Sequence, residues 1–226
     1  MIRVYDSGSE TTTEEIAKRV ADTGYERILD IGGAEKPLAC ATHVLDVVDY
    51  QYRRQDQQRG PGPERFTADT WAVHDVNRLP WPYPDGYFDF VWASQILEDI
   101  RDPIAVCYEM QRVAKQGYIG TVDRSYESSA RQDDGVIGYH HHRWLIEASE
   151  ECNLIRFEFK SPILHVAPEY RPSEAYRWLY HVEWEQGFYA IETWVGGDQG
   201  QRAALKAYLG RYEMEKERLE KLREKP

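Results

Sequence analysis

The chain has 226 residues, 42% of them apolar, and its 39 acidic residues outnumber the 28 lysines and arginines to give a net charge of −11. This length and apolar content suit one sizeable core. A protein with this negative net charge repels the phosphate backbone of a nucleic acid, and the sequence has no evident local basic patch. We therefore expect no nucleic-acid partner. No apolar run approaches the roughly 20 residues of a membrane span, the N-terminus lacks an apolar signal segment, and three cysteines far apart are typical of reduced thiols. We therefore expect a cytoplasmic protein without membrane attachment.

Short apolar runs alternate with helical patterns through the first half of the chain. Overlapping capping boxes and a closing glycine predict a helix over residues 11–24. An Asp-Pro pair predicts the start of a second helix, which extends to Lys115. The runs expected to form buried strands are 27–31, 42–48, 71–75, 88–93 and 118–122. This alternation predicts an α/β fold with a doubly wound, mostly parallel sheet.

The pattern changes after Asp123. Residues 143–151 are expected to be helical, and residues 154–166 extended. The aromatic stretch 176–195 is expected to supply antiparallel C-terminal strands, and residues 201–225 a highly charged helix.

In a doubly wound sheet the ligand lies beyond the carboxyl ends of the strands, at the switch point. Glycines after the first strand allow close approach of a ligand. An acid after the second strand suits ribose hydroxyls, and an acid after the third suits an adenine amino group. Taken singly, each of these residues is explained as well by a turn or a cap. In this order, they favour a nucleoside-like cofactor.

Three stretches carry a family resemblance: ILDIGGAEKP, VLDVVDY and HDVNRLPWPYPDGYFDFVWASQILEDIRDPIAVCYEMQRVAKQGYI. Over roughly residues 25–123 they resemble class I S-adenosylmethionine-dependent methyltransferases, in particular the "methyltransferase type 11" group. We expect one domain over residues 1–226, with a cofactor-binding core at about 25–123, acceptor-side elements at about 124–200 and a charged helix at 201–226. The resemblance implies S-adenosyl-L-methionine as the cofactor.

The resemblance implies a role for each strand end. Asp30, Gly32 and Gly33 would face the methionine portion of the cofactor, and Ser94 would lie beside the sulfonium. Asp46 would bind the ribose hydroxyls, with Asp49 as a less favoured substitute. The residues that would hold the adenine are Asp75 and Val76.

Two positions depart from the group's pattern. The usual Gly-x-Gly is Gly32-Gly33-Ala34, and the common histidine pair of the fourth-strand block appears as Gln95 and Asp99. These departures keep open a non-catalytic binding or regulatory subunit that retains the fold. A nicotinamide enzyme is disfavoured because the chain has no GxGxxG and no long helix after Gly33 to face a pyrophosphate.

The acceptor side is expected after the fifth strand, where three successive histidines occur. A base or acceptor-binding role for His140 or His142 competes with a structural role for the run. In a strand only these two would share a face, and no neighbouring Cys or carboxylate completes an obvious ligand set, so we expect no metal. Aromatic residues in the C-terminal third either stack on a sugar or flat acceptor, or are ordinary sheet residues.

Together these patterns predict a methyltransferase that acts on a small molecule or saccharide, at oxygen. The thin leucine stripe of the last helix makes a homodimer an open alternative to a solvated tail.

Overall fold

The computed structural model describes residues 1–5, 10–129, 137–161 and 178–193, together with residues 203 and 206. The helices are α1 (Glu10–Thr23), α2 (Pro103–Val113), α3 (Arg124–Glu127) and the short 3-10 turns η1 (Tyr50–Tyr52) and η2 (Ala68–Thr70). The strands are β1 (Ile2–Tyr5), β2 (Ile28–Ile31), β3 (His43–Asp46), β4 (Trp71–Val73), β5 (Phe90–Ser94), β6 (Gln116–Val122), β7 (Trp144–Ser149), β8 (Leu154–Phe159), β9 (Leu179–Glu185) and β10 (Tyr189–Glu192).

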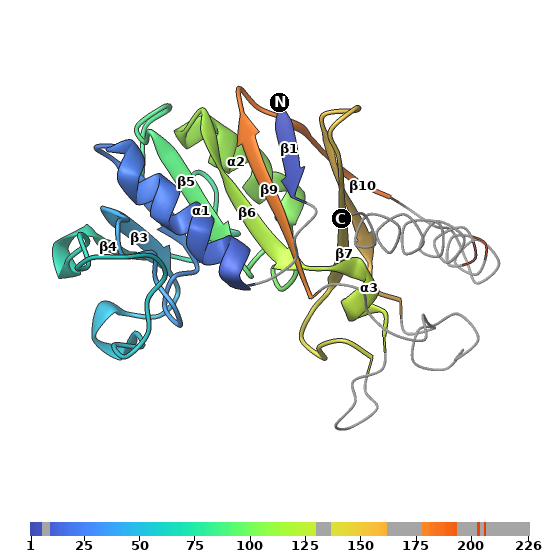
Figure 1. The fold of residues 1–226 in the computed structure, drawn as a ribbon, viewed down its shortest axis with the longest axis horizontal. Coiled ribbons are helices and arrows are strands. Elements are labelled where there is room, and N and C mark those ends of the chain that lie inside the picture. Colours follow the sequence, from blue (N-terminus) through green and yellow to red (C-terminus); the bar gives the residue numbers. More distant parts are fainter. Residues whose placement is uncertain (6–9, 130–136, 162–177, 194–202, 204–205, 207–226) are drawn as a thin grey trace, which may run out of the picture.

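Seven strands form one sheet in the order β1-β9-β6-β5-β2-β3-β4 (Figure 1). The pairs β2–β3, β3–β4, β2–β5 and β5–β6 are all parallel. Strand β9 runs antiparallel to both β6 and β1. This arrangement confirms the predicted α/β fold, a mostly parallel sheet to which the C-terminal region adds an antiparallel strand.

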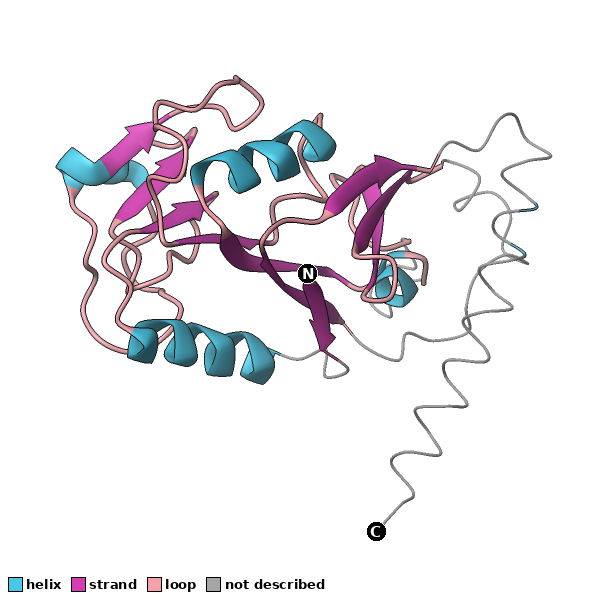
Figure 2. Cartoon of the chain, turned by 90° about the horizontal axis from the view of Figure 1, so that it is seen from above, coloured by secondary structure: helices cyan, strands magenta, loops and turns pink. Residues whose placement is uncertain are grey.

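The two long helices cover opposite faces of the sheet, as Figure 2 shows from above. Successive residues of a strand point to opposite faces, and β2 illustrates the division. Ile28 lies in the buried cluster that contains Ile16 and Val20 of α1. Leu29 lies in the other buried cluster, with Met110 of α2. The sheet is therefore doubly wound, as predicted.

The helix signals in the sequence also act as expected. Helix α1 is followed directly by Gly24, whose φ of +77° is the left-handed conformation that ends many helices. Asp102 caps α2 by accepting a hydrogen bond from the backbone N–H of Ala105 at 3.0 Å, and Pro103 is the first helical residue.

The expected helix at residues 143–151 is wrong, because β7 occupies this segment. Strand β7 pairs antiparallel with β8, which places Ile146 opposite Phe157 and buries both. Glu147, Ala148 and Glu150 favour a helix in isolation, but pairing with a neighbouring strand outweighs such weak local preference.

Two further differences concern the ends of the chain. Strand β1, at the edge of the large sheet, was not expected, since a run of only four residues is a weak signal even though Ile2, Val4 and Tyr5 favour a strand. The aromatic stretch 176–195 divides between two sheets: β9 joins the large one, whereas β10 pairs in parallel with β8 in a small sheet of order β10-β8-β7.

The charged helix predicted at 201–225 falls outside the described residues except for 203 and 206. Within the described part of the chain, no helix combines the length and apolar character needed to cross a bilayer.

Candidate functional site

The strand order reverses between β2 and β5, because β3 and β4 follow on one side and β6 on the other. Such a switch point is where open α/β sheets bind their ligands, beyond the carboxyl ends of the strands. Residues 30–33 close β2 or follow it, Asp46 closes β3, and Ser94 closes β5. The structure thus brings most of the predicted cofactor-binding positions to one edge of the sheet.

Asp30 is the most deeply buried of these acids, with 2% of its surface exposed. Its Oδ2 accepts a hydrogen bond from the backbone N–H of Leu38 at 2.8 Å. Burial raises the pKa of Asp30 to about 7, an effect that the charge of Arg59 opposes. A Cβ on Gly33 would lie 2.6 Å from Asp30 Oδ2, so only glycine leaves room for this carboxyl group.

Asp46 is also buried, and its carboxylate organises the loop after β2. One oxygen accepts a hydrogen bond from Ala34 N at 3.0 Å, and the other from Val48 N at 2.8 Å. A carboxylate has about four acceptor positions, so each oxygen keeps one for a hydroxyl group. Asp49, the substitute considered from the sequence, instead caps η1 by accepting from Gln51 N.

Asp75 and Val76 follow β4 but differ in exposure. Asp75 is exposed, and it accepts hydrogen bonds from the backbone and side-chain N–H groups of Asn77. Both bonds hold the pKa of Asp75 below its ordinary value, and the backbone N–H has the larger effect. Val76 is buried beside Trp81, whose indole N–H donates to the Val76 carbonyl. Asp75 is thus accessible at the edge of the sheet, whereas Val76 belongs to the core.

Arg59 is a residue at this edge that sequence reasoning missed. It belongs to the loop 51–65, whose composition shows no core-forming pattern, yet it is buried. Its backbone is fixed by hydrogen bonds to Pro37 and Ala39, and its Nη2 donates to Gln95 Oε1 at 3.0 Å. The loop therefore delivers a cation between the tips of β2 and β5, and a single arginine in a Gln-rich loop carries no signal for this placement.

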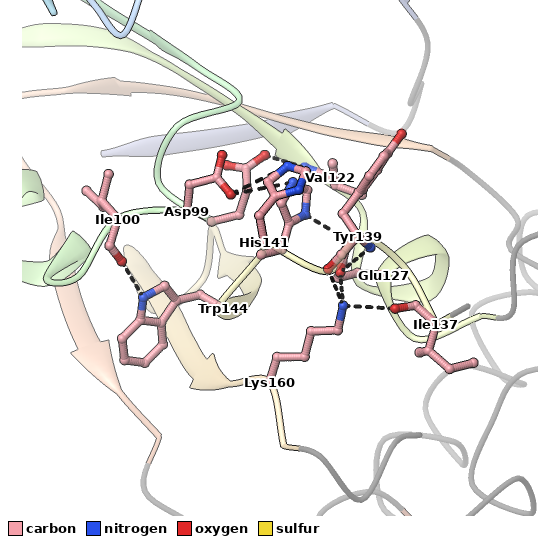
Figure 3. A network of polar contacts seen from close by, with 11 residues as sticks. Asp99, Ile100, Val122, Glu127, Ile137, Tyr139, His141, Trp144 and Lys160 are labelled. Atoms are coloured by element: carbon pink, nitrogen blue, oxygen red, sulfur yellow. Dashed lines mark hydrogen bonds and ion pairs between the residues drawn. The ribbon is translucent and has the colours of Figure 1, made fainter. Parts of the chain in front are cut away.

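A second polar group gathers around Glu127 of α3, after the end of β6 (Figure 3). His142 Nδ1 lies 2.8 Å from Oε2 of Glu127, a residue of α3. Lys160 donates to the same Glu127 carboxylate and also to the carbonyls of Ile137 and Tyr139, at 3.0 and 2.8 Å. His142, Glu127 and Lys160 are all buried, so the group is a fixed chain of charges.

The charges around His142 alter its protonation. Burial lowers the pKa of His142, but the hydrogen bond to Glu127 and the charges of Glu98 and Asp99 outweigh this effect and raise the pKa above the ordinary value. Glu98 lies behind the site with its own pKa raised to about 7 by burial. Its Oε1 accepts from Val122 N at 3.3 Å, and its carbonyl accepts from Arg143 N at 2.7 Å. Glu98 thereby ties the tip of β6 to the histidine segment.

A pocket of about 610 Å³ opens over this second group. Its lining residues are Asp99, His140, His141, His142, Arg143, Phe159 and Lys160. His140 and His141 lie in a turn, not in a strand, so the expectation that only His140 and His142 would share a face does not apply. His140 is exposed at the pocket, while His141 and His142 both lie near Asp99. The structure therefore places both predicted catalytic histidines at one cavity.

The central part of the chain matches a known family. Residues 27–119 match the model of a methyltransferase domain, which covers the three stretches that carry the sequence resemblance. This match confirms the predicted family and enzyme class for those residues, and with them S-adenosylmethionine as the cofactor. No curated protein matches the chain.

Several solved structures are similar to this chain at low identity. An S-adenosylmethionine-dependent methyltransferase from Mesorhizobium loti has 18% identity and a TM-score of 0.43, over 76% of this chain and 97% of the other. The PH0226 protein from Pyrococcus horikoshii has 14% identity and a TM-score of 0.44, over 78% and 88%. A putative methyltransferase from Bacillus halodurans has 12% identity and a TM-score of 0.40, over 76% and 96%. Scores this low add nothing to what the sheet order and the family match establish.

Proposed function

We propose that the protein methylates an oxygen atom of a small molecule or saccharide, on the premise that residues 27–119, which match the model of a methyltransferase domain, bind S-adenosylmethionine. The observation that carries this proposal is the pocket beside the strand tips, where His142 is held by Glu127. A histidine oriented by a carboxylate is suited to accept the proton of a hydroxyl group.

The residues at the first part of the edge fit the cofactor. The buried Asp46 carboxylate, with a free acceptor position on each oxygen, is suited to two ribose hydroxyls. Asp75 would accept from the adenine amino group at the exposed end of β4, beside Val76. Gly32 and Gly33 would leave space for the methionine portion near Asp30, and Ser94 would face the sulfur.

When bound, S-adenosylmethionine supplies a methyl group on a sulfonium, and displacement by oxygen leaves the S–C electron pair on sulfur as S-adenosylhomocysteine. The chain's own contribution is alignment of the acceptor with that methyl group. His142 would act as a general base and accept the proton of the acceptor hydroxyl. Glu127 and Lys160 position His142 through the hydrogen bonds described above. His140, at the pocket rim, would contact the acceptor.

The acceptor class follows from the size and chemistry of the pocket. A volume of about 610 Å³ is within the range of small-molecule sites. The imidazoles and Arg143 offer hydrogen bonds, and the Phe159 ring offers an apolar surface, which together suit a hydroxylated ring or sugar. The net charge of −11 argues against a nucleic-acid acceptor. We also propose that residues 1–226 act as one domain and work in the cytoplasm.

Titration calorimetry with S-adenosylhomocysteine tests the cofactor half of the proposal. Asp75→Ala should weaken binding by about 1–3 kcal/mol, as expected when an acceptor is removed from a donor. Asp56→Ala is the matched control, since Asp56 is also exposed and pairs with Arg54. Unchanged affinity in a folded Asp75 variant would refute that assignment.

Release of S-adenosylhomocysteine in the presence of hydroxylated acceptors tests the catalytic half. Phenols, sugars and nucleotide sugars form a suitable panel, and His142→Ala should reduce turnover by about 10²-fold or more. Retention of turnover within a few-fold would remove His142 from the mechanism. Tight cofactor binding without turnover on any acceptor would favour the regulatory-subunit alternative, for which Gln95 and Asp99 are the supporting departures.

A further inference from the structure

We propose that Asp99, His141 and His142 form a binding site for one divalent transition-metal cation of the Zn²⁺ type. This inference deepens the proposed function and rests on it for the role of the cation, though not for its binding. Asp99 lies in the loop after β5, whereas the two histidines precede β7, so the fold and not the local sequence brings the three together.

The geometry of the three ligand atoms suits a cation. One atom from each residue lies within 4.8 Å of the others. The Nε2 atoms of His141 and His142 are both 3.8 Å from Asp99 Oδ1. Zn–N and Zn–O bonds of about 2.0–2.2 Å place tetrahedral ligands about 3.3 Å apart. A small rotation of the exposed His141 side chain and of the partly exposed Asp99 side chain would close the difference.

Asp99 Oδ1 is an acceptor that lacks a partner. This oxygen is shielded from solvent and accepts no hydrogen bond among the described residues. The separation of 3.8 Å from either imidazole is too long for a hydrogen bond. A carboxylate oxygen withdrawn from water between two nitrogen atoms is better explained by a cation that all three share than by a surface ion pair, which contributes little.

The orientation of His142 supports the same assignment. Its Nδ1 is engaged by Glu127, which leaves Nε2 directed at Asp99. Metal-binding histidines commonly donate their other ring N–H to a carboxylate, which fixes the tautomer and makes the ligand more basic. Glu127 is itself fixed by Lys160 and by the backbone N–H of Tyr139 at 2.9 Å. Figure 3 shows this chain of contacts leading from Lys160 toward Asp99 and His141.

The pocket gives the cation a role. All three ligands line it, so coordination positions not filled by protein would face the cavity. Two histidines and one carboxylate with an open position are typical of catalytic zinc sites. An acceptor hydroxyl bound there would lose its proton to water more readily, since a zinc ion lowers the pKa of its bound water to about 7. In the metal-bound protein, His142 would hold the cation through Nε2 in place of accepting the proton directly.

The experiment compares two neighbouring histidines of the same turn in the full chain. His141 is a proposed ligand with 66% of its side chain exposed, and His140 is exposed but outside the ligand set. Both alanine variants should therefore fold. After removal of metals with a chelator, Zn²⁺ is titrated by calorimetry and Co²⁺ by its visible absorption, which reports imidazole coordination.

We expect one Zn²⁺ per wild-type chain and a loss of affinity of at least about 10-fold in His141→Ala. Asp99→Asn should lose a similar factor, while His140→Ala should bind within about 3-fold of wild type. Equal affinities of the His140 and His141 variants would overturn the proposal, as would failure of the wild type to bind either metal. Titration of S-adenosylhomocysteine in the same samples separates the two ideas: cofactor binding without Zn²⁺ binding removes the metal site alone, and loss of cofactor binding removes the proposed function.

Discussion

The buried carboxyl of Asp30 makes a prediction about stability that can be worked out from the structure. A pKa raised from 3.8 to about 7 means that the unfolded chain ionises before the folded one. As pH rises through this interval the unfolded state binds fewer protons, so folding stability falls. Each unit of pKa corresponds to about 1.36 kcal/mol, so the full loss is about 4 kcal/mol. It begins near pH 4 and levels off above about pH 7.

Asp30→Asn should remove this dependence, because asparagine keeps an acceptor for Leu38 N but cannot ionise. The difference in free energy of unfolding between variant and wild type, from urea denaturation, should grow in favour of the variant by about 2–3 kcal/mol between pH 5 and pH 8. Asp56→Asn is the control. Asp56 is fully exposed, and a hydrogen bond from Arg54 lowers its pKa. The difference in free energy of unfolding between Asp56→Asn and wild type must therefore not grow in favour of the variant as pH rises. A flat difference for Asp30→Asn would refute the assignment of a protonated, buried acid.

Three further predictions concern the rest of the edge. Asp99→Asn should lower the pKa of His142, because the substitution removes a carboxylate whose charge raises that pKa. Histidine NMR titration in the presence of chelator should detect the fall. An unchanged pKa would mean that Asp99 lies too far from His142 to affect its protonation. Glu127→Gln leaves Lys160 buried without its anion and should lower the free energy of unfolding, measured by urea denaturation, by roughly 3–5 kcal/mol. The double variant with Lys160→Met should recover a substantial part of this loss. Equal losses in the single and double variants would show that the charge pair is not the cause. Gly33→Ala should weaken S-adenosylhomocysteine binding at least about 10-fold, since its Cβ would meet the pinned Asp30 carboxyl, whereas Gly86→Ala, which meets open space, should not change it.

The parts of the site that the sequence predicted are those encoded locally. Asp46 and Ser94 close strands whose apolar runs end visibly, and Asp30 lies one residue before the end of β2; parallel pairing then brings the strand ends to one edge. The Asp102–Pro103 start of α2 is of the same kind, since the cap and the capped N–H lie three residues apart.

The parts that the sequence could not predict depend on contacts between distant segments. Glu127, His142 and Lys160 come from three separate segments of the chain, and nothing in the neighbourhood of one residue indicates the others. The segment that contains β7 illustrates the same limit, because its strand conformation is decided by pairing with β8 and not by its own residues. Arg59 is held in its buried position by backbone hydrogen bonds between its loop and residues 37–39.

One short loop joins the cofactor side of the edge to the acceptor side. It begins at Gln95, whose φ of +56° turns the chain sharply after β5 and whose side chain accepts from Arg59. It continues through Glu98, which holds both Val122 and Arg143, to Asp99 at the pocket. Buried acids such as Glu98 are costly to keep in a fold, and this one occupies the position that sets the spacing between the strand tips and the histidines. The two positions at which this chain departs from the group's histidine pair, 95 and 99, are therefore the two ends of the connection: Gln95 contacts Arg59, and Asp99 lies near His141 and His142.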